Sequence, residues 1–165
     1  MRDSQVSRVY AAERSFNAHH REEDYLPEEE DVQKWVDKLT SYQWYKRRWG
    51  KIRPRIVVSK TPSGKRGASG GWGKIEMGRR MRYKMIVLHE MSHAIKVDDP
   101  AHGRDFCRRF LELVWFALGK EDYYVLKHAF KEYGVKFHKK KNYTSPVSEK
   151  VLVNLRKGRE KRNNG

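Results

Sequence analysis

The chain contains a single cysteine, Cys107, among its 165 residues. An internal disulfide and a metal site built from two or four cysteines are therefore both excluded. Because Cys107 falls in an apolar pattern of helical spacing, we expect a packed thiol rather than a nucleophile. Long apolar runs are also missing, so the sequence offers no membrane span. The polar N-terminus lacks the apolar core of a secretory signal, and we expect a cytoplasmic protein.

Hydrophobic residues are scarce, at 38% of the chain, while charged residues reach 35%. This length favours one domain with a single core, which we expect over residues 1–135, followed by a basic tail over residues 136–165. Residues 1–40 carry a net charge of −4 and the remainder carries +20, which gives the total of +16. A surface this basic concentrates polyanions. We therefore expect contact with nucleic acid through the basic surface and tail, the alternative being that the charge only keeps the protein soluble.

Two histidines and a glutamate form a His-Glu-x-x-His pattern at His89, Glu90 and His93, within the apolar stretch 83–95. Residues four apart lie one above the other on a helix, so both imidazoles can reach one metal ion. Glu90 is rotated about 100° from His89, which puts its carboxylate beside the ion, where it can take a proton from an activated water. A helix that is apolar on nearly every side is buried, and buried histidines need partners or a metal.

A catalytic zinc usually takes three protein ligands and a water, so the motif needs a third ligand. His102 is the leading candidate, because it lies in a short proline-containing turn that can fold back toward the first helix. The alternatives are an oxygen ligand from Asp98 or Asp99, or Glu112 from the next helix.

The order His89-Glu90-Met91-Ser92-His93, a spacer of eight residues and then His102-Gly103-x-x-Phe106 resembles the core of the SprT-like zinc metallopeptidases, the Spartan-related family. Residues 2–5 and 8–13 also resemble a small family of proposed metallohydrolases of actinobacteria and their phages. The resemblance implies that the three histidines bind Zn²⁺, that Glu90 is the catalytic acid/base and that the substrate is a protein or peptide. Many SprT-like proteins carry a cysteine-rich zinc ribbon, which this chain cannot form.

Two strands are expected before the motif, near residues 53–58 and 72–77. Pro54 suits the start of an edge strand. The stretch 61–73 is rich in Gly and Ser, and we expect a flexible hairpin loop there. In the resembling peptidases an edge strand before the metal helix receives the substrate by backbone pairing, and the resemblance gives this role to residues 72–77.

Helical spacing predicts further helices over residues 4–20, from Asp31 to about residue 42, over 105–117 and over 121–133, with a short helix near 147–156 in the tail. The aromatic and basic residues of 44–49 could stack on bases, but a core face is the favoured interpretation. The adjacent His19 and His20 point apart and are interpreted as solvated. Asp105 is expected to cap its helix, with a hydrogen bond to a ligating histidine as the alternative.

Together these patterns predict an α+β, zincin-like domain in which a small sheet packs beside the metal helix, with additional helices. The predicted activity is zinc-assisted hydrolysis of a peptide bond, with Glu90 as the base. Tyr123 or Tyr124 could stabilise an oxyanion, although packing is the simpler role. A metal-dependent hydrolase of nucleic acid and a DNA-binding protein with a structural zinc are the rival functions. The sequence indicates no oligomeric state.

Overall fold

The computed structural model describes residues 3–17, 22–61, 67–98 and 100–137. Its elements follow one another along the chain as α1 (Val6–Asn17), η1 (Glu22–Asp24), α2 (Glu29–Ser41), α3 (Gln43–Tyr45), η2 (Lys46–Gly50), β1 (Val57–Lys60), β2 (Ala68–Gly71), β3 (Lys74–Met77), η4 (Arg79–Met81), α4 (Lys84–Ile95), α5 (Arg104–Ala117) and α6 (Lys120–Glu132). The expected α+β class is confirmed. The predicted N-terminal helix and the three later helices all form, with ends that differ by a few residues.

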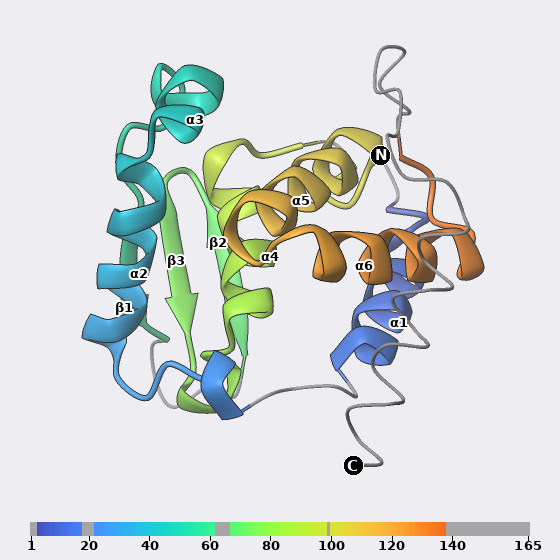
Figure 1. Cartoon of the computed structure of the whole chain (residues 1–165), viewed down its shortest axis with the longest axis horizontal. Helices are drawn as coiled ribbons and strands as arrows, with labels where there is room; N and C mark the ends of the chain where they lie inside the picture. Colours follow the sequence, from blue (N-terminus) through green and yellow to red (C-terminus); the bar gives the residue numbers. More distant parts are fainter. Residues whose placement is uncertain (1–2, 18–21, 62–66, 99, 138–165) are drawn as a thin grey trace.

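The three strands form one mixed sheet in the order β1-β3-β2. β1 pairs with β3 in parallel and β2 pairs with β3 antiparallel. The expectation of an edge strand over residues 72–77 is wrong, because β3 lies between the two other strands. β1 is an edge strand, as expected, but it covers Val57–Lys60 instead of residues 53–58, so Pro54 lies before the strand. Figure 1 shows α2 beside β1 at one edge of the sheet, and α4 beside β2 at the other edge, between the sheet and the helices α5, α6 and α1.

The stretch expected to be a flexible loop contains β2. Its glycines permit close packing, because a Cβ added at Gly70 would lie 2.1 Å from the carbonyl oxygen of Glu90. β2 therefore lies directly against the main chain of the metal helix, and only glycine fits at this point. Residues 62–66 of the same stretch lie outside the described residues.

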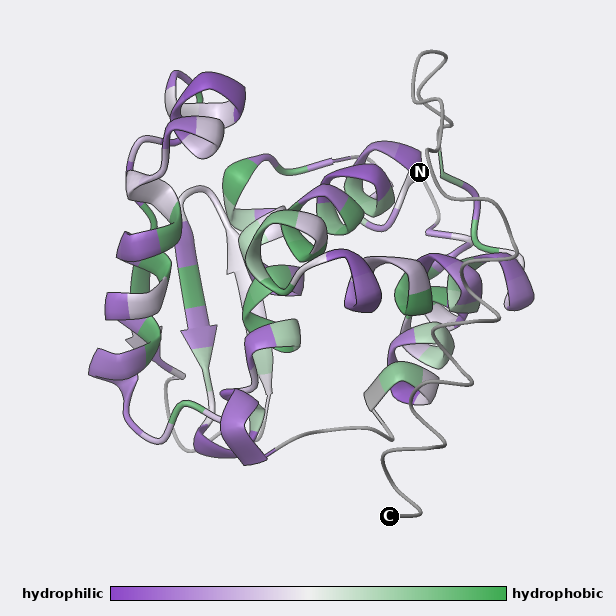
Figure 2. Ribbon diagram, in the orientation of Figure 1, coloured by the Kyte–Doolittle hydropathy of each residue, from purple (hydrophilic) through white to green (hydrophobic). Residues whose placement is uncertain are grey.

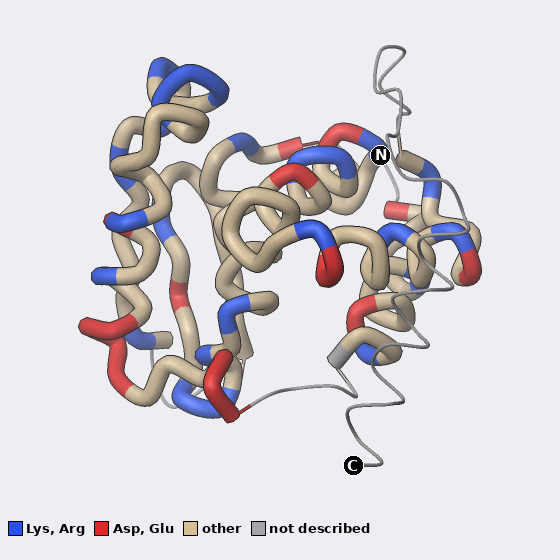
Figure 3. Tube along the Cα trace, viewed as in Figure 1, with Lys and Arg blue, Asp and Glu red and all other residues tan. Residues whose placement is uncertain are grey.

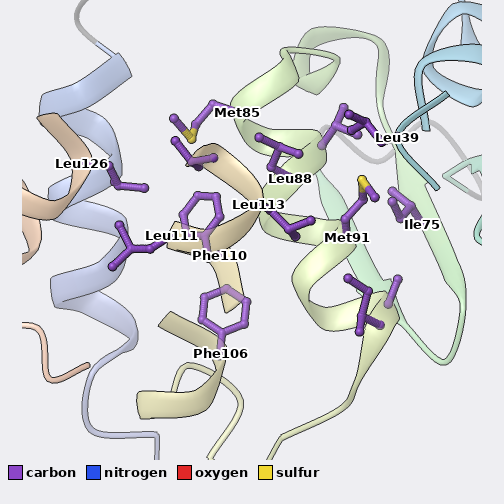
Figure 4. Packing of buried hydrophobic residues seen from close by; sticks show 14 of the residues in the cluster. Leu39, Ile75, Met85, Leu88, Met91, Phe106, Phe110, Leu111, Leu113 and Leu126 are labelled. Atoms are coloured by element: carbon purple, nitrogen blue, oxygen red, sulfur yellow. The ribbon is translucent and has the colours of Figure 1, made fainter. Parts of the chain in front are cut away.

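α4 is apolar around most of its circumference, as the sequence indicated, and it is the centre of the core. Leu39 of α2 and Ile75 of β3 pack on one side of it, while Phe110 of α5 and Leu126 of α6 lie on the other (Figure 4). The hydropathy colouring shows the same arrangement, with the apolar faces of the helices turned inward (Figure 2). A helix enclosed in this way holds its side chains in fixed directions, which is what a metal centre requires.

α1 packs against α6, so the two ends of the described chain lie side by side (Figure 1). Val9 and Ala12 of α1 are fully buried, and Val135 and Phe137 after α6 also pack against the core. The packed region therefore extends at least two residues beyond the expected boundary at residue 135. The rest of the expected tail, with its short helix, lies outside the described residues, as do His19 and His20.

The aromatic residues of 44–49 form part of the core, as favoured. Tyr45 and Trp49 are buried, and Trp44 stacks on Phe116 of α5 with ring centroids 4.3 Å apart. The Lys and Arg residues between them gather on the outer side of this corner of the molecule, and acidic residues gather around η1 and the start of α2 (Figure 3). No helix in the described part of the chain is both long enough and apolar enough to cross a bilayer.

Candidate metal centre

Three histidine side chains converge at the C-terminal half of α4. His89 and His93 come from this helix, and His102 comes from the turn that precedes α5. The Nε2 atom of His102 lies 3.3 Å from that of His93 and 3.3 Å from that of His89. One nitrogen from each of the three residues lies within 4.8 Å of the others. The structure therefore brings together the three residues that the sequence selected.

The nitrogen separations fit a tetrahedral metal site. Ligands at the corners of a tetrahedron lie roughly 3.3–3.4 Å apart when their bonds to zinc are about 2.0–2.1 Å long. Nε2 of His102 lies 3.3 Å from Nε2 of His89 and 3.3 Å from Nε2 of His93. Three imidazole nitrogens occupy three corners, which leaves one corner for a further ligand.

Glu13 of α1 holds the first of these histidines. Its Oε1 atom lies 2.5 Å from Nδ1 of His89, and both side chains are largely buried. A carboxylate accepts a hydrogen bond, so Nδ1 carries the proton and the Nε2 lone pair is left for a metal. The Glu13 carboxylate also raises the pKa of His89, although burial acts in the opposite direction. A proton and a metal ion therefore compete for Nε2 of His89.

Asp3 holds His102 in the same way. Its Oδ2 atom lies 2.6 Å from Nδ1 of His102 and also accepts the backbone N–H of His102 at 3.0 Å. Gln5 supports this contact by donating from Nε2 to the His102 carbonyl oxygen, at 2.8 Å. With Nδ1 of both His89 and His102 protonated, two nitrogen lone pairs face one another at 3.3 Å. Such lone pairs repel unless a cation lies between them, so this donor set fits a bound metal.

His93 lies nearest the C-terminal end of α4, and its ring stacks on Phe106 with centroids 4.3 Å apart. Burial, followed by the nearby His89 and His102, lowers the pKa of His93 to about 3. His93 is therefore neutral over the whole physiological range, and its Nε2 lone pair is free to bind a metal.

Glu90 of α4 is 7% exposed, and it lies near enough to Tyr10 of α1 to raise the pKa of that phenol. Burial raises the pKa of Glu90 to about 7, and the Glu13 carboxylate adds to this effect while His89 opposes it. No described residue hydrogen-bonds to the Glu90 carboxylate, so its oxygens are available to a water or a substrate. A pKa near neutrality is suited to a group that both accepts and donates a proton.

Tyr10 of α1 lies beside two of the three histidines, and the sequence did not single it out. Its ring lies 5.6 Å from the His89 ring and 5.2 Å from the His102 ring, and it is 41% exposed. Burial, with the nearby Glu90, raises the pKa of Tyr10, so the phenol keeps its proton. Tyr123 and Tyr124 pack instead against Trp115 at the other end of α5.

The other candidate ligands have different partners. Asp98 pairs with the buried Arg109, and Glu112 pairs with Arg48, with Oε2 2.9 Å from Nε. Asp105 does not cap α5 with its side chain, and its carboxylate lies 3.4 Å from Arg108 in the first turn of the helix. The cap and the alternative contact with a ligating histidine are therefore both wrong for Asp105. Asp99 lies outside the described residues.

The residues that sequence reasoning missed all come from the N-terminal segment: Asp3, Gln5, Tyr10 and Glu13. The one signal for them was the resemblance of residues 2–5 and 8–13 to the second family, and that resemblance assigned them no role. Comparison with known proteins finds no matching family model, no matching curated protein and no matching solved structure.

Proposed function

We propose that the chain is a zinc-dependent metallohydrolase with a zincin-like arrangement, and that it cleaves peptide bonds as the SprT-like metallopeptidases do. One observation carries this proposal: Nε2 of His102 lies at a tetrahedral separation from Nε2 of His89 and from Nε2 of His93. Carboxylates also hold Nδ1 of His89 and of His102. A set of neutral imidazoles with one open corner is typical of a catalytic zinc site, whereas structural zinc sites are usually closed by four protein ligands.

His89, His93 and His102 would hold the ion. When bound, zinc would polarise the scissile carbonyl and lower the pKa of a water. Asp3 and Glu13 fix the direction of two ligand rings and increase their basicity. All three rings come from well-packed parts of the core, so little reorganisation is required when the ion binds.

Glu90 is the proposed general base. Its carboxylate follows the first ligand in the chain, is buried, and accepts no hydrogen bond from the described residues. Glu90 takes the proton from the attacking water and passes it to the leaving amine. A positive ion next to Glu90 favours its charged form, so the pKa of about 7 of the metal-free protein falls when the site is loaded.

β2 is the proposed docking strand for an extended peptide, in place of residues 72–77. It is an edge strand, and no other described strand pairs with its outer side. Gly70 lies against the main chain of Glu90, so a peptide paired with β2 would pass next to the proposed base. Backbone pairing accepts many sequences, because the main-chain groups provide most of the affinity.

The test uses the full chain, loaded with one equivalent of zinc and incubated with unfolded casein, with and without a chelator. Glu90→Gln should keep the metal and lose hydrolysis by several orders of magnitude, while the exposed Glu30→Gln is the matched control and should behave as wild type. His93→Ala should lose both zinc and thermal stability. Loss of metal from Glu90→Gln would instead make Glu90 a ligand or a structural residue.

Labelled DNA and RNA are incubated in parallel. Zinc-dependent cleavage of nucleic acid that requires Glu90, without proteolysis, would mean that the same site hydrolyses phosphodiester bonds instead of peptide bonds. Stoichiometric zinc with no turnover of any substrate by the wild-type chain would overturn the enzymatic proposal and leave a structural metal.

A further inference from the structure

A two-residue turn, Trp72-Gly73, joins β2 to β3. Both residues have positive φ, 48° at Trp72 and 78° at Gly73. This is the pattern of a type I′ hairpin turn, in which Asn-Gly is strongly preferred because Asn tolerates positive φ. Trp72 is the only residue other than glycine with positive φ in the described ranges. A bulky aromatic residue is unfavourable here, and such strain points to a role beyond folding.

Trp72 is also the most exposed of the large hydrophobic residues in the described part of the chain, at 78%. The Arg53 guanidinium lies 5.4 Å from its ring centroid. Arg53 is itself fixed, because its Nε donates to the carbonyl oxygen of Ala94 at 3.1 Å. One face of the indole is thus backed by a cation held in place, while most of the ring is open to solvent.

The residues around this turn are basic or apolar. The backbone N–H of Gly73 donates to the Ala94 carbonyl oxygen, and that of Val57 donates to the Gly73 carbonyl oxygen, so three segments of the chain meet here. We call this region the Trp72 surface, and its residues are Arg53, Arg55, Val57, Trp72, Lys74 and Val97, together with the exposed Lys96, which precedes Val97 in the chain.

The cations of the Trp72 surface are largely uncompensated. Within the described residues no carboxylate pairs with Arg53, Arg55 or Lys96, and only Lys74 has an acidic partner, Glu76, at 2.6 Å. Such a surface attracts polyanions. An exposed indole with a free face adds a platform on which a flat aromatic group can stack.

We propose that the Trp72 surface binds single-stranded nucleic acid, with a base stacked on Trp72 and phosphates held by the surrounding cations. An unpaired base offers the π-face that the indole fits, and in a duplex that face is covered by its neighbours. An acidic peptide would satisfy the cations but would give no reason for an aromatic ring at a strained position.

The location links this surface to the metal helix. Ala94, which contacts both Gly73 and Arg53, directly follows His93. Four residues along a helix correspond to about 6 Å between Glu90 and Ala94. Nucleic acid held at Trp72 therefore lies close to the metal centre. The inference goes beyond the proposed hydrolysis and does not depend on it.

The test measures fluorescence anisotropy of labelled dT and rU oligonucleotides with the full chain, at one fixed salt concentration. Trp72→Asn should weaken binding about tenfold, because one base–aromatic stack is lost. The same variant should raise the melting temperature by a few degrees, because Asn is favoured at this turn position. Trp72→Phe keeps a stacking face and should stay within about threefold of wild type.

Two controls separate stacking from charge. Trp72→Asn keeps every cation, so its affinity should fall with salt at the wild-type slope, whereas Lys74→Gln with Lys96→Gln should reduce that slope. Tyr133→Asn removes another exposed aromatic, directly after α6, and should leave binding unchanged. Glu90→Gln should also bind as wild type, so loss of hydrolysis and loss of binding are independent results.

Equal affinity of wild type and Trp72→Asn for both oligonucleotides would overturn the proposal. Any binding that is observed would then be assigned to the basic tail. Stronger binding to a duplex of equal length, unaffected by Trp72→Asn, would overturn it too. Binding to phosphatidylserine vesicles that requires Trp72, with no effect on oligonucleotides, would assign the surface to membranes instead. If Trp72→Asn does not fold, Trp72→Gly is used, because glycine also accepts positive φ.

Discussion

The Oε1 atom of Glu13 lies 2.5 Å from Nδ1 of His89, although the two residues are 76 positions apart in the sequence. Asp3 makes the equivalent contact with His102 across 99 positions. The N-terminal segment thus supplies the carboxylates behind two of the three ligand rings. The candidate metal centre has its two carboxylates in place only when α1 has packed against the rest of the domain, so we expect assembly of the site and packing of α1 to be coupled.

Replacement of either carboxylate by its amide tests this arrangement. Glu13→Gln and Asp3→Asn should each weaken zinc binding about 10- to 100-fold, because they remove the negative charge that orients and polarises the ring. Competition with a chromophoric chelator at pH 7 measures the affinity, and Glu30→Gln is the surface control. Unchanged zinc affinity in both amide variants would mean that these contacts serve folding alone.

Close packing of β2 on α4 gives a second prediction. Gly70→Ala would put its Cβ 2.1 Å from the Glu90 carbonyl oxygen, so the strand must move away from the helix. Overpacking of this kind costs about 1–3 kcal/mol in the free energy of unfolding, and we expect the upper end because a main-chain atom is struck.

The neighbouring glycine is the matched control for this prediction. The nearest neighbour of an alanine Cβ at Gly71 is Cγ2 of Val97, at 4.0 Å. Gly71→Ala should therefore change the unfolding free energy, measured by urea titration, far less than Gly70→Ala. Equal effects of the two substitutions would show that flexibility of the strand, rather than contact with α4, explains its glycines.

The glycines of β2 also explain why the sequence predicted a loop at residues 61–73 and an edge strand at residues 72–77. A run rich in Gly and Ser predicts a flexible loop when the helix that will pack on it is unknown. A prediction that omits β2 leaves β3 with β1 as its one partner, and β3 is then assigned to an edge of the sheet. Strand order depends on pairings that sequence periodicity does not encode.

The convergence of the three candidate ligands was predictable for the opposite reason. His89 and His93 are four residues apart on one helix face, so local geometry fixes their relationship. His102 follows after a short turn, which limits where it can lie. Asp3, Tyr10 and Glu13 reach the centre only through tertiary packing, and no spacing in the sequence relates them to the motif.

The protonation of His93 predicts how the metal-free protein responds to acid. Its pKa is lowered to about 3 in the folded state by burial, then by His89, His102 and Arg109, while Asp3 opposes the shift. The unfolded chain titrates near 6.5. The contribution of His93 to stability is therefore present above pH 6.5 and is lost as the pH falls toward 3, because only the unfolded chain takes up the proton.

Urea unfolding of chelator-treated protein at pH 7 and pH 5 measures this effect. His93→Gln cannot titrate, so wild type should lose on the order of 1–2 kcal/mol more than this variant between the two pH values. The comparison between variants is needed because the raised pKa values of His89 and Glu90 act with the opposite sign. Identical losses would mean that His93 takes up a proton in the folded protein.

Arg109 of α5 binds backbone carbonyl groups at the C-terminal end of α4, and these contacts lead to the last prediction. Its Nε donates to the Ser92 carbonyl oxygen at 2.8 Å, one of its terminal nitrogens donates to the Lys96 carbonyl oxygen at 3.0 Å, and the guanidinium pairs with Asp98. The Arg109 and Asp98 side chains are 8% and 9% exposed. Removal of one member of such a pair leaves a buried charge without a partner.

Arg109→Met should therefore lower the unfolding free energy by about 3–5 kcal/mol, and should weaken zinc binding because the last turn of α4 carries His93. Asp98→Asn alone should also destabilise, but the double variant should cost less than the sum of the two single changes, since it leaves no unpaired charge. Urea titration of all four proteins in the presence of a chelator completes this double-mutant cycle. Additive effects would mean that the two side chains act independently, and that Arg109 stabilises α4 through its contacts with the Ser92 and Lys96 carbonyl groups.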